Sequence, residues 1–156
     1  MNQTVSDDVK SYSQLLEELG IDHEIVEHPE SSAIPEVVSF LGITLADTLP
    51  TMIMKTGDEF VAIIRRGDCR LDFKKIKQLV GKNVRMATPE EFTDLTNLPL
   101  GAARVYNPGL KTYIDEKVFT KEYSTGGSGA FNCSIHYKTE TLKHLPDSLV
   151  VSITQE

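Results

Sequence analysis

The sequence predicts an α+β protein in which short helices pack on a mixed β-sheet of about six to eight strands. Short apolar or alternating runs indicate the strands, and amphipathic segments with helical spacing lie between them. The two kinds of element neither alternate regularly nor separate into blocks, which favours a mixed sheet over repeated βαβ units. A chain of 156 residues with 40% apolar content suits one domain, expected over residues 1–156.

Capping residues, prolines and glycines set the expected helices. Ser6 can cap a first helix that ends at Gly20. Thr88 starts another helix, with Pro89 at its first position and Glu91 three residues after the cap, which is the pattern of a capping box. Further helices are expected between Pro35 and Gly42, between Asp72 and Gly81, and over 139–144, and the Thr88 helix should end near Asn97.

The strands are predicted from apolar runs and from alternation. Phe60–Ile64 is a continuous apolar run that suits a central strand, and Lys55–Glu59 joins it to Thr51–Met54 as a hairpin. Phe131–Tyr137 alternates strictly between apolar and polar residues, as a half-buried strand does. The remaining strands are expected at 24–27, 84–87, 112–114, 121–125 and 149–153. The core should include Ile53, Ile63, Ile64 and Ile135.

Charge and composition exclude several classes of partner. The net charge is −7 and the pI about 5.1, so a general basic coat for DNA is absent and RNA contact must be local. One basic patch is available, formed by Arg65, Arg66, Arg70, Lys74, Lys75 and Lys77. No apolar run approaches the roughly 18 residues of a membrane span. The polar, acidic N-terminus argues against a signal peptide, which favours a cytoplasmic protein.

The two cysteines and four histidines show no metal-binding pattern. Cys69 and Cys133 lie far apart without CxxC spacing, and reduced thiols in a cytoplasmic protein are expected. No zinc-ligand spacing involves the histidines. We therefore expect neither a metal nor another cofactor.

Two glycine-containing stretches are the candidates for chemistry. Gly101–Gly109 is a loop, and Gly126–Gly129 is expected to form a turn between the last two long strands. Glycine adopts φ > 0 and lets another backbone or a ligand approach closely. Backbone N–H groups exposed in such a turn can hold an anion. A flexible hairpin tip beside a solvated polar strand face is the alternative interpretation.

Several segments occur in a characteristic order and spacing: Glu36–Gly42, the GDCRLDFKK segment Gly67–Lys75, Val84–Ala87 followed by Glu90-Glu91, Tyr113–Asp115, and Gly126-Gly127. In this the chain resembles the YbaK/EbsC family of aminoacyl-tRNA deacylases. That family includes free-standing editing proteins and the editing domain inserted in some prolyl-tRNA synthetases. The resemblance runs from about His28 to the C-terminus.

The resemblance implies a pocket for the acceptor end of a mischarged aminoacyl-tRNA, where the ester to the wrong amino acid is cut without a metal. It also implies an aminoacyl-tRNA synthetase as a possible partner. Loop backbone groups of Gly101 and Ala102 would take part in catalysis. The residues that the resemblance assigns to substrate binding are His28, Arg104, Thr125, Gly126, Gly127 and Asn132.

The chain departs from the family pattern at three places. The family's functional lysine falls on Pro50, and Lys55 lies at an odd offset, which points to the other face of a strand. The loop Gly101–Val105 has no proline at its fifth place. The family's aspartate beyond the double glycine is Asn132, which keeps a hydrogen-bonding side chain without the charge.

Several assignments stay open at this point. His28 precedes a proline and would serve equally well as a strand-end cap, and an exposed loop position is the commoner setting for Arg104. Tyr106 could stack on an adenine or pack over its own loop, and His136 is expected to meet solvent. Position 50 separates two functions: a deacylase acting in trans, and a non-catalytic module that binds a nucleotide, an aminoacyl group or a protein. A hydrolase of another small ester or amide is a third possibility.

Overall fold

The computed structural model describes residues 5–99 and 101–156, and it confirms the α+β class. The helices are α1 (Asp7–Glu18), α2 (Ile34–Leu41), α3 (Phe73–Val80) and α4 (Pro89–Thr96), with 3-10 turns η1 (Leu45–Asp47), η2 (Glu116–Thr120) and η3 (Thr139–His144). The strands are β1 (His23–Glu27), β2 (Thr48–Leu49), β3 (Thr51–Thr56), β4 (Glu59–Ile64), β5 (Arg85–Met86), β6 (Lys111–Asp115), β7 (Tyr123–Gly127), β8 (Cys133–Lys138) and β9 (Ser148–Val151).

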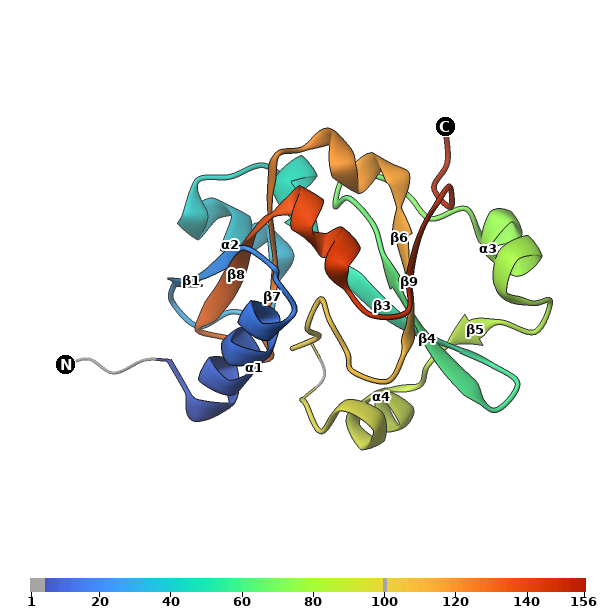
Figure 1. Cartoon of the computed structure of the whole chain (residues 1–156), viewed down its shortest axis with the longest axis horizontal. Helices are drawn as coiled ribbons and strands as arrows, with labels where there is room; N and C mark the ends of the chain where they lie inside the picture. The colour runs from blue at the N-terminus through green and yellow to red at the C-terminus, as the bar shows by residue number, and fades with distance from the viewer. Residues whose placement is uncertain (1–4, 100) are drawn as a thin grey trace.

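The strands of the described residues form two mixed sheets where the sequence indicated one. The first sheet has the order β1-β8-β7-β2, with only the β7–β2 pair parallel. The second has the order β5-β3-β4-β6-β9, in which β6 is parallel to both of its neighbours. In Figure 1 the first sheet lies with α1 and α2 in the left half of the molecule, and the second lies with α3 in the right half.

Pro50 marks the point where the chain passes from one sheet to the other. Before it, Leu49 of β2 pairs in parallel with Gly126 of β7. After it, Thr51 of β3 pairs antiparallel with Ile64 of β4. Proline has no N–H to donate to a ladder, so it suits a break between two strands. The sequence prediction missed β2 because a two-residue strand before a proline has no periodic pattern.

The helix ends follow the predicted capping chemistry. The Ser6 side chain accepts a hydrogen bond from the Val9 N–H at the start of α1. At the start of α4, Thr88 and Glu91 form the reciprocal capping box. Gly42 ends α2 in the left-handed conformation, with φ of 66°. These ends were predictable because each depends on residues within one turn of the helix.

The predicted core residues are buried. Ile53, Ile63, Ile64 and Ile135 are each at most 5% exposed, which confirms their assignment to the core. Within the described residues, none of the helices is long and apolar enough to cross a membrane.

The predicted glycine turn is displaced along the chain. Gly126 and Gly127 belong to strand β7, and the connection to β8 begins after them. Within that connection it is Gly129 that adopts a positive φ, of 92°. Glycine is the commonest turn residue, which is why the sequence pointed to a turn here. The strand position has a tertiary cause, because Ala103 and Val105 pack directly against these two glycines.

Candidate functional site

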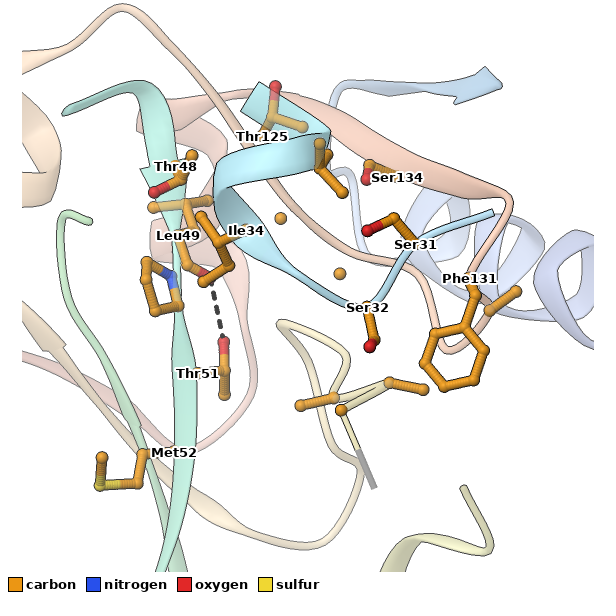
Figure 2. Close-up of a pocket in the computed structure, with 18 of the residues that line it drawn as sticks. Ser31, Ser32, Ile34, Thr48, Leu49, Thr51, Met52, Thr125, Phe131 and Ser134 are labelled. Carbon is orange, nitrogen blue, oxygen red and sulfur yellow. Dashed lines mark hydrogen bonds between the residues drawn. The ribbon is translucent and has the colours of Figure 1, made fainter. Parts of the chain in front are cut away.

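A cavity of about 400 Å³ lies where the two sheets approach each other. One wall is the run from Thr48 to Ile53, which crosses Pro50. Thr125–Gly127 of β7 and Ser134 of β8 form another wall, and the loop 101–103 closes one side. Figure 2 shows Thr48, Leu49, Thr51 and Met52 following one another along one wall, with Ser31, Ser32 and Phe131 on the opposite side of the view.

The double glycine lets the cavity loop pack directly on β7. A Cβ atom added to Gly127 would lie 1.9 Å from the carbonyl oxygen of Ala103, and one added to Gly126 would lie 2.2 Å from a methyl group of Val105. No real side chain tolerates such distances, so both positions require glycine. The glycines therefore accommodate the backbone and side chains of the 101–105 loop, and they fix that loop as part of the cavity wall.

Hydrogen bonds hold the same loop from the other side. The Ala102 N–H donates to the carbonyl of Pro99 at 3.1 Å, so this predicted backbone donor is already engaged. The Tyr106 N–H donates to the hydroxyl of Tyr12 at 2.8 Å, and that hydroxyl lies 3.1 Å from the hydroxyl of Tyr137. The Tyr106 side chain is buried. The structure therefore supports the interpretation that it packs against its own loop, and not that it stacks on an adenine.

The described residues that line the cavity include no lysine, arginine, aspartate or glutamate. Pro50 is among them and contributes only its ring and carbonyl. Lys55 lies outside the lining, paired with Glu91 at 3.3 Å. Arg104 also lies outside it, with its guanidinium 5.0 Å from the centre of the Tyr12 ring. Neither cation takes the place of the family lysine in this structure.

His28 joins two elements of the cavity wall. Its backbone N–H donates to the carbonyl of Asn132 at 3.0 Å, which extends the pairing of β1 with β8. Its side chain reaches the hydroxyl of Ser134, with 2.9 Å between Nε2 and Oγ, and both residues line the cavity. His28 is thus a strand-end residue and a cavity residue at once. Asn132 is not among the lining residues.

The polar face of β8 contains functional candidates that the sequence interpretation left out. The alternation placed Ser134 on the polar face of the strand, for which a solvated face was one interpretation, and the structure buries it against His28. His136 was expected to meet solvent, but it is half-buried and lies 3.1 Å from the Thr125 hydroxyl. The ring of His136 also stacks on Tyr123. The alternation of β8 was the available signal for Ser134, because it placed this side chain opposite the core face.

The cysteine next to Ser134 points to the other side of the strand. Cys133 is buried in the core cluster that also contains Ile135, and it is also among the residues that line the cavity. Burial raises the pKa of its thiol, and the Ser128 hydroxyl opposes that rise. A thiol with a raised pKa is a poor nucleophile near neutral pH. In residues 5–99 and 101–156, no group of three potential ligands is arranged to hold a metal ion.

A second, shallower hollow adjoins the cavity at Met52, which lines both. Arg65, Arg70 and the exposed ring of Phe73 border it. Arg65 donates to the carbonyls of the following loop, whereas the Arg70 side chain forms no ion pair with a described residue. The predicted basic patch thus begins beside the cavity.

Residues 28–145 match the aminoacyl-tRNA editing domain family. The chain belongs to this family. Among curated proteins, the editing-domain sequence is 33% identical over 111 residues to the proline–tRNA ligase of Heliobacterium modesticaldum, which covers 69% of the chain and 19% of the ligase. It is 32% identical over 102 residues to the ligase of Caldicellulosiruptor bescii, covering 64% of the chain and 18% of the ligase. The match thus spans about a fifth of each ligase.

Solved structures show the same fold. The editing domain superposes on a proposed trans-editing enzyme for prolyl-tRNA synthetase with a TM-score of 0.84 at 21% identity, covering 98% of this chain and 100% of the other. A hypothetical protein superposes with a TM-score of 0.85 at 21% identity, covering 92% of this chain and 99% of the other. At such identities the likeness concerns the fold.

Proposed function

We propose that this editing domain hydrolyses the ester of a mischarged aminoacyl-tRNA in trans, in the cytoplasm. The observation that carries the proposal is the cavity: a partly open, mostly apolar space walled by the 101–103 loop and the double glycine of β7. Family membership and the ligase relatives supply the substrate class. The trans-editing protein, which is matched over its full length, supports action as a separate chain.

The cavity has the two parts that such a substrate needs. Met52, Ile53 and Phe92 offer apolar surface for an amino acid side chain. The 101–103 loop offers backbone donors near the ester. Ala102 is engaged, but the Ala103 N–H donates to no acceptor among the described residues, so it is the better candidate to stabilise a developing oxyanion.

The neighbouring hollow suits the strand that carries the aminoacyl group. Arg70 would hold a phosphate, and the exposed ring of Phe73 could stack on a base. An overall charge of −7 opposes tRNA binding over most of the surface, so this local patch would direct the acceptor end towards Met52.

A non-catalytic role is the second candidate, and the uncharged lining of the cavity favours it. With Pro50 in place of a lysine, the domain could bind an aminoacyl-adenosine end or a synthetase and release it unchanged. If the domain is a deacylase, the wild type should hydrolyse mischarged tRNA slowly or act on only a few tRNAs. Removing one preorganised electrostatic contact commonly lowers a rate by about 10²–10³.

Release of labelled amino acid from a panel of mischarged tRNAs tests the proposal. At least one tRNA should lose its amino acid faster with the wild-type protein than without it. Pro50→Lys should accelerate that reaction, by about tenfold or more, because a cation in the cavity would stabilise the developing negative charge. Gly101→Val should slow it, since Gly101 has a φ of 91° and faces Ser32. Binding of aminoacyl-adenosine without hydrolysis by any variant would favour the binding module.

A further inference from the structure

Ser134 has a histidine beside its hydroxyl and belongs to the cavity lining, as an oxygen nucleophile requires. The Ser134 hydroxyl lies 2.9 Å from Nε2 of His28, and both side chains border the cavity. Figure 2 shows the Ser134 hydroxyl on the wall that also carries Ser31. A serine hydroxyl is a weak nucleophile on its own and becomes effective beside a general base.

A third group orients the histidine. Nδ1 of His28 lies 2.8 Å from the carbonyl oxygen of Pro29. A carbonyl only accepts, so Nδ1 carries the hydrogen and donates to it. In the neutral ring Nε2 is then the acceptor, and the Ser134 hydroxyl donates to Nε2. This order of carbonyl, imidazole and hydroxyl is the one in which histidine can remove the serine proton.

The same bonding pattern occurs once more among the described residues, away from the cavity. Nε2 of His23 lies 2.6 Å from the Ser13 hydroxyl, and its Nδ1 lies 2.8 Å from the carbonyl oxygen of Ile21. Neither Ser13 nor His23 lines the cavity. The chain therefore supplies its own control for what the hydrogen bonds do without a substrate space.

We propose that Ser134 is the nucleophile of the cavity and His28 its general base. The inference rests on the proposed function for its substrate. Ser134 Oγ bonds to the ester carbonyl carbon while its proton moves to Nε2 of His28. The bond from that carbon to the ribose oxygen then breaks, and the ribose oxygen takes the proton from His28. Water next attacks the acyl-serine and gives a proton to Nε2, the bond to Ser134 breaks, and Oγ recovers the proton as the amino acid leaves.

A fluorophosphonate probe tests this pair without any tRNA. The purified chain is treated with the probe, and the modified residue is located by peptide mass spectrometry. A phosphorus–oxygen bond should form at Ser134 with loss of fluoride. Ser134→Ala should remove the adduct, and His28→Gln should slow its formation by about 10² or more, because a glutamine cannot accept the proton. In the Ser13→Ala variant, Ser134 should be labelled at the wild-type rate.

The site of the adduct in the wild type decides the question even if a variant folds poorly. Absence of labelling, or an adduct on any other residue, overturns the assignment of Ser134. Equal labelling of the wild type and of folded His28→Gln overturns the role of His28. Labelling at Ser134 without hydrolysis of any mischarged tRNA would reject the proposed function and leave the pair in place. Hydrolysis of a mischarged tRNA without labelling of Ser134 would support the proposed function and reject the Ser134–His28 pair.

Discussion

The two ends of β1 carry the same hydrogen-bond pattern in different surroundings. At the first residue, His23 joins a serine hydroxyl to a backbone carbonyl, and just beyond the last residue His28 does the same. Ser13 comes from helix α1, whereas Ser134 comes from the neighbouring strand and faces the cavity. The hydrogen bonds by themselves hold a loop or a strand end in place. Only the pair that borders the cavity is a candidate site.

The largest expected effect is on the stability of the whole fold. Ile63 is 1% exposed in β4, in the sheet that carries neither pair. Ile63→Ala should lower the free energy of unfolding by roughly 2–5 kcal/mol, because it leaves a cavity in a packed core. Chemical denaturation measures the change. The fluorophosphonate labelling rate per folded molecule should stay unchanged. An unaltered denaturation midpoint for Ile63→Ala would show that Ile63 does not contribute to the core as described.

Gly127→Ala should have a smaller effect, confined to the cavity, and should therefore distinguish the His28 pair from the His23 pair. Gly127→Ala places a methyl group against the carbonyl oxygen of Ala103, so the 101–103 loop must move. We expect a loss of about 1–3 kcal/mol of stability, as for other overpacked sites. Labelling of Ser134 should slow as well. NMR of the histidine rings provides the readout: the His28 signals should shift and the His23 signals should not.

Gly57→Ala is the control for this change. Gly57 lies in the β3–β4 turn with open space around its Cβ position, and its φ of 60° makes the substitution mildly strained without crowding. It should leave both the His28 signals and the labelling rate unchanged. An equal shift of the two histidines in Gly127→Ala would contradict the local role assigned to the double glycine.

The smallest effect is expected for Arg70→Ala, which should weaken tRNA binding without changing the reactivity of Ser134. Arg70→Ala removes one exposed cation from the hollow beside Met52. Deacylation of tRNA should weaken, and the slope of log KM against log salt should fall by about one, as expected for a lost phosphate contact. Fluorophosphonate labelling should not change. Salt titration of the deacylation rate is the measurement, and the same slope in wild type and variant would remove Arg70 from the proposed tRNA path.

Local features of the fold could be predicted from the sequence, and features that depend on tertiary contact could not. The capping box of Thr88 and Glu91 and the apolar run that buries Ile63 are encoded within a few residues. The division into two sheets depends on what β2 and β3 pair with on either side of Pro50. The double glycine looked like a turn because its contact, the 101–105 loop, is distant in the sequence.

The residues of the candidate site divide in the same way, between those that the sequence pointed to and those that only tertiary contacts bring to the cavity. The resemblance brought His28, Pro50, Gly101 and the double glycine to one cavity, where the structure also places them. It did not indicate Ser134, whose partner lies 106 residues away in the chain. Alternation along β8 placed Ser134 on the polar face, but a polar face can meet either solvent or a cavity. Arg104 looked available because a loop arginine is commonly exposed, whereas it packs over the Tyr12 ring.

The most direct test is a time course of deacylation with the best mischarged tRNA, run side by side for the wild type, Ser134→Ala and Ser13→Ala. All three should unfold at similar temperatures, and the amino acid released over time is the quantity compared. We predict that Ser13→Ala matches the wild type within about twofold, whereas Ser134→Ala is slower by about 10² or more. Hydrolysis by Ser134→Ala at the wild-type rate would contradict the claim that the cavity acts through this serine.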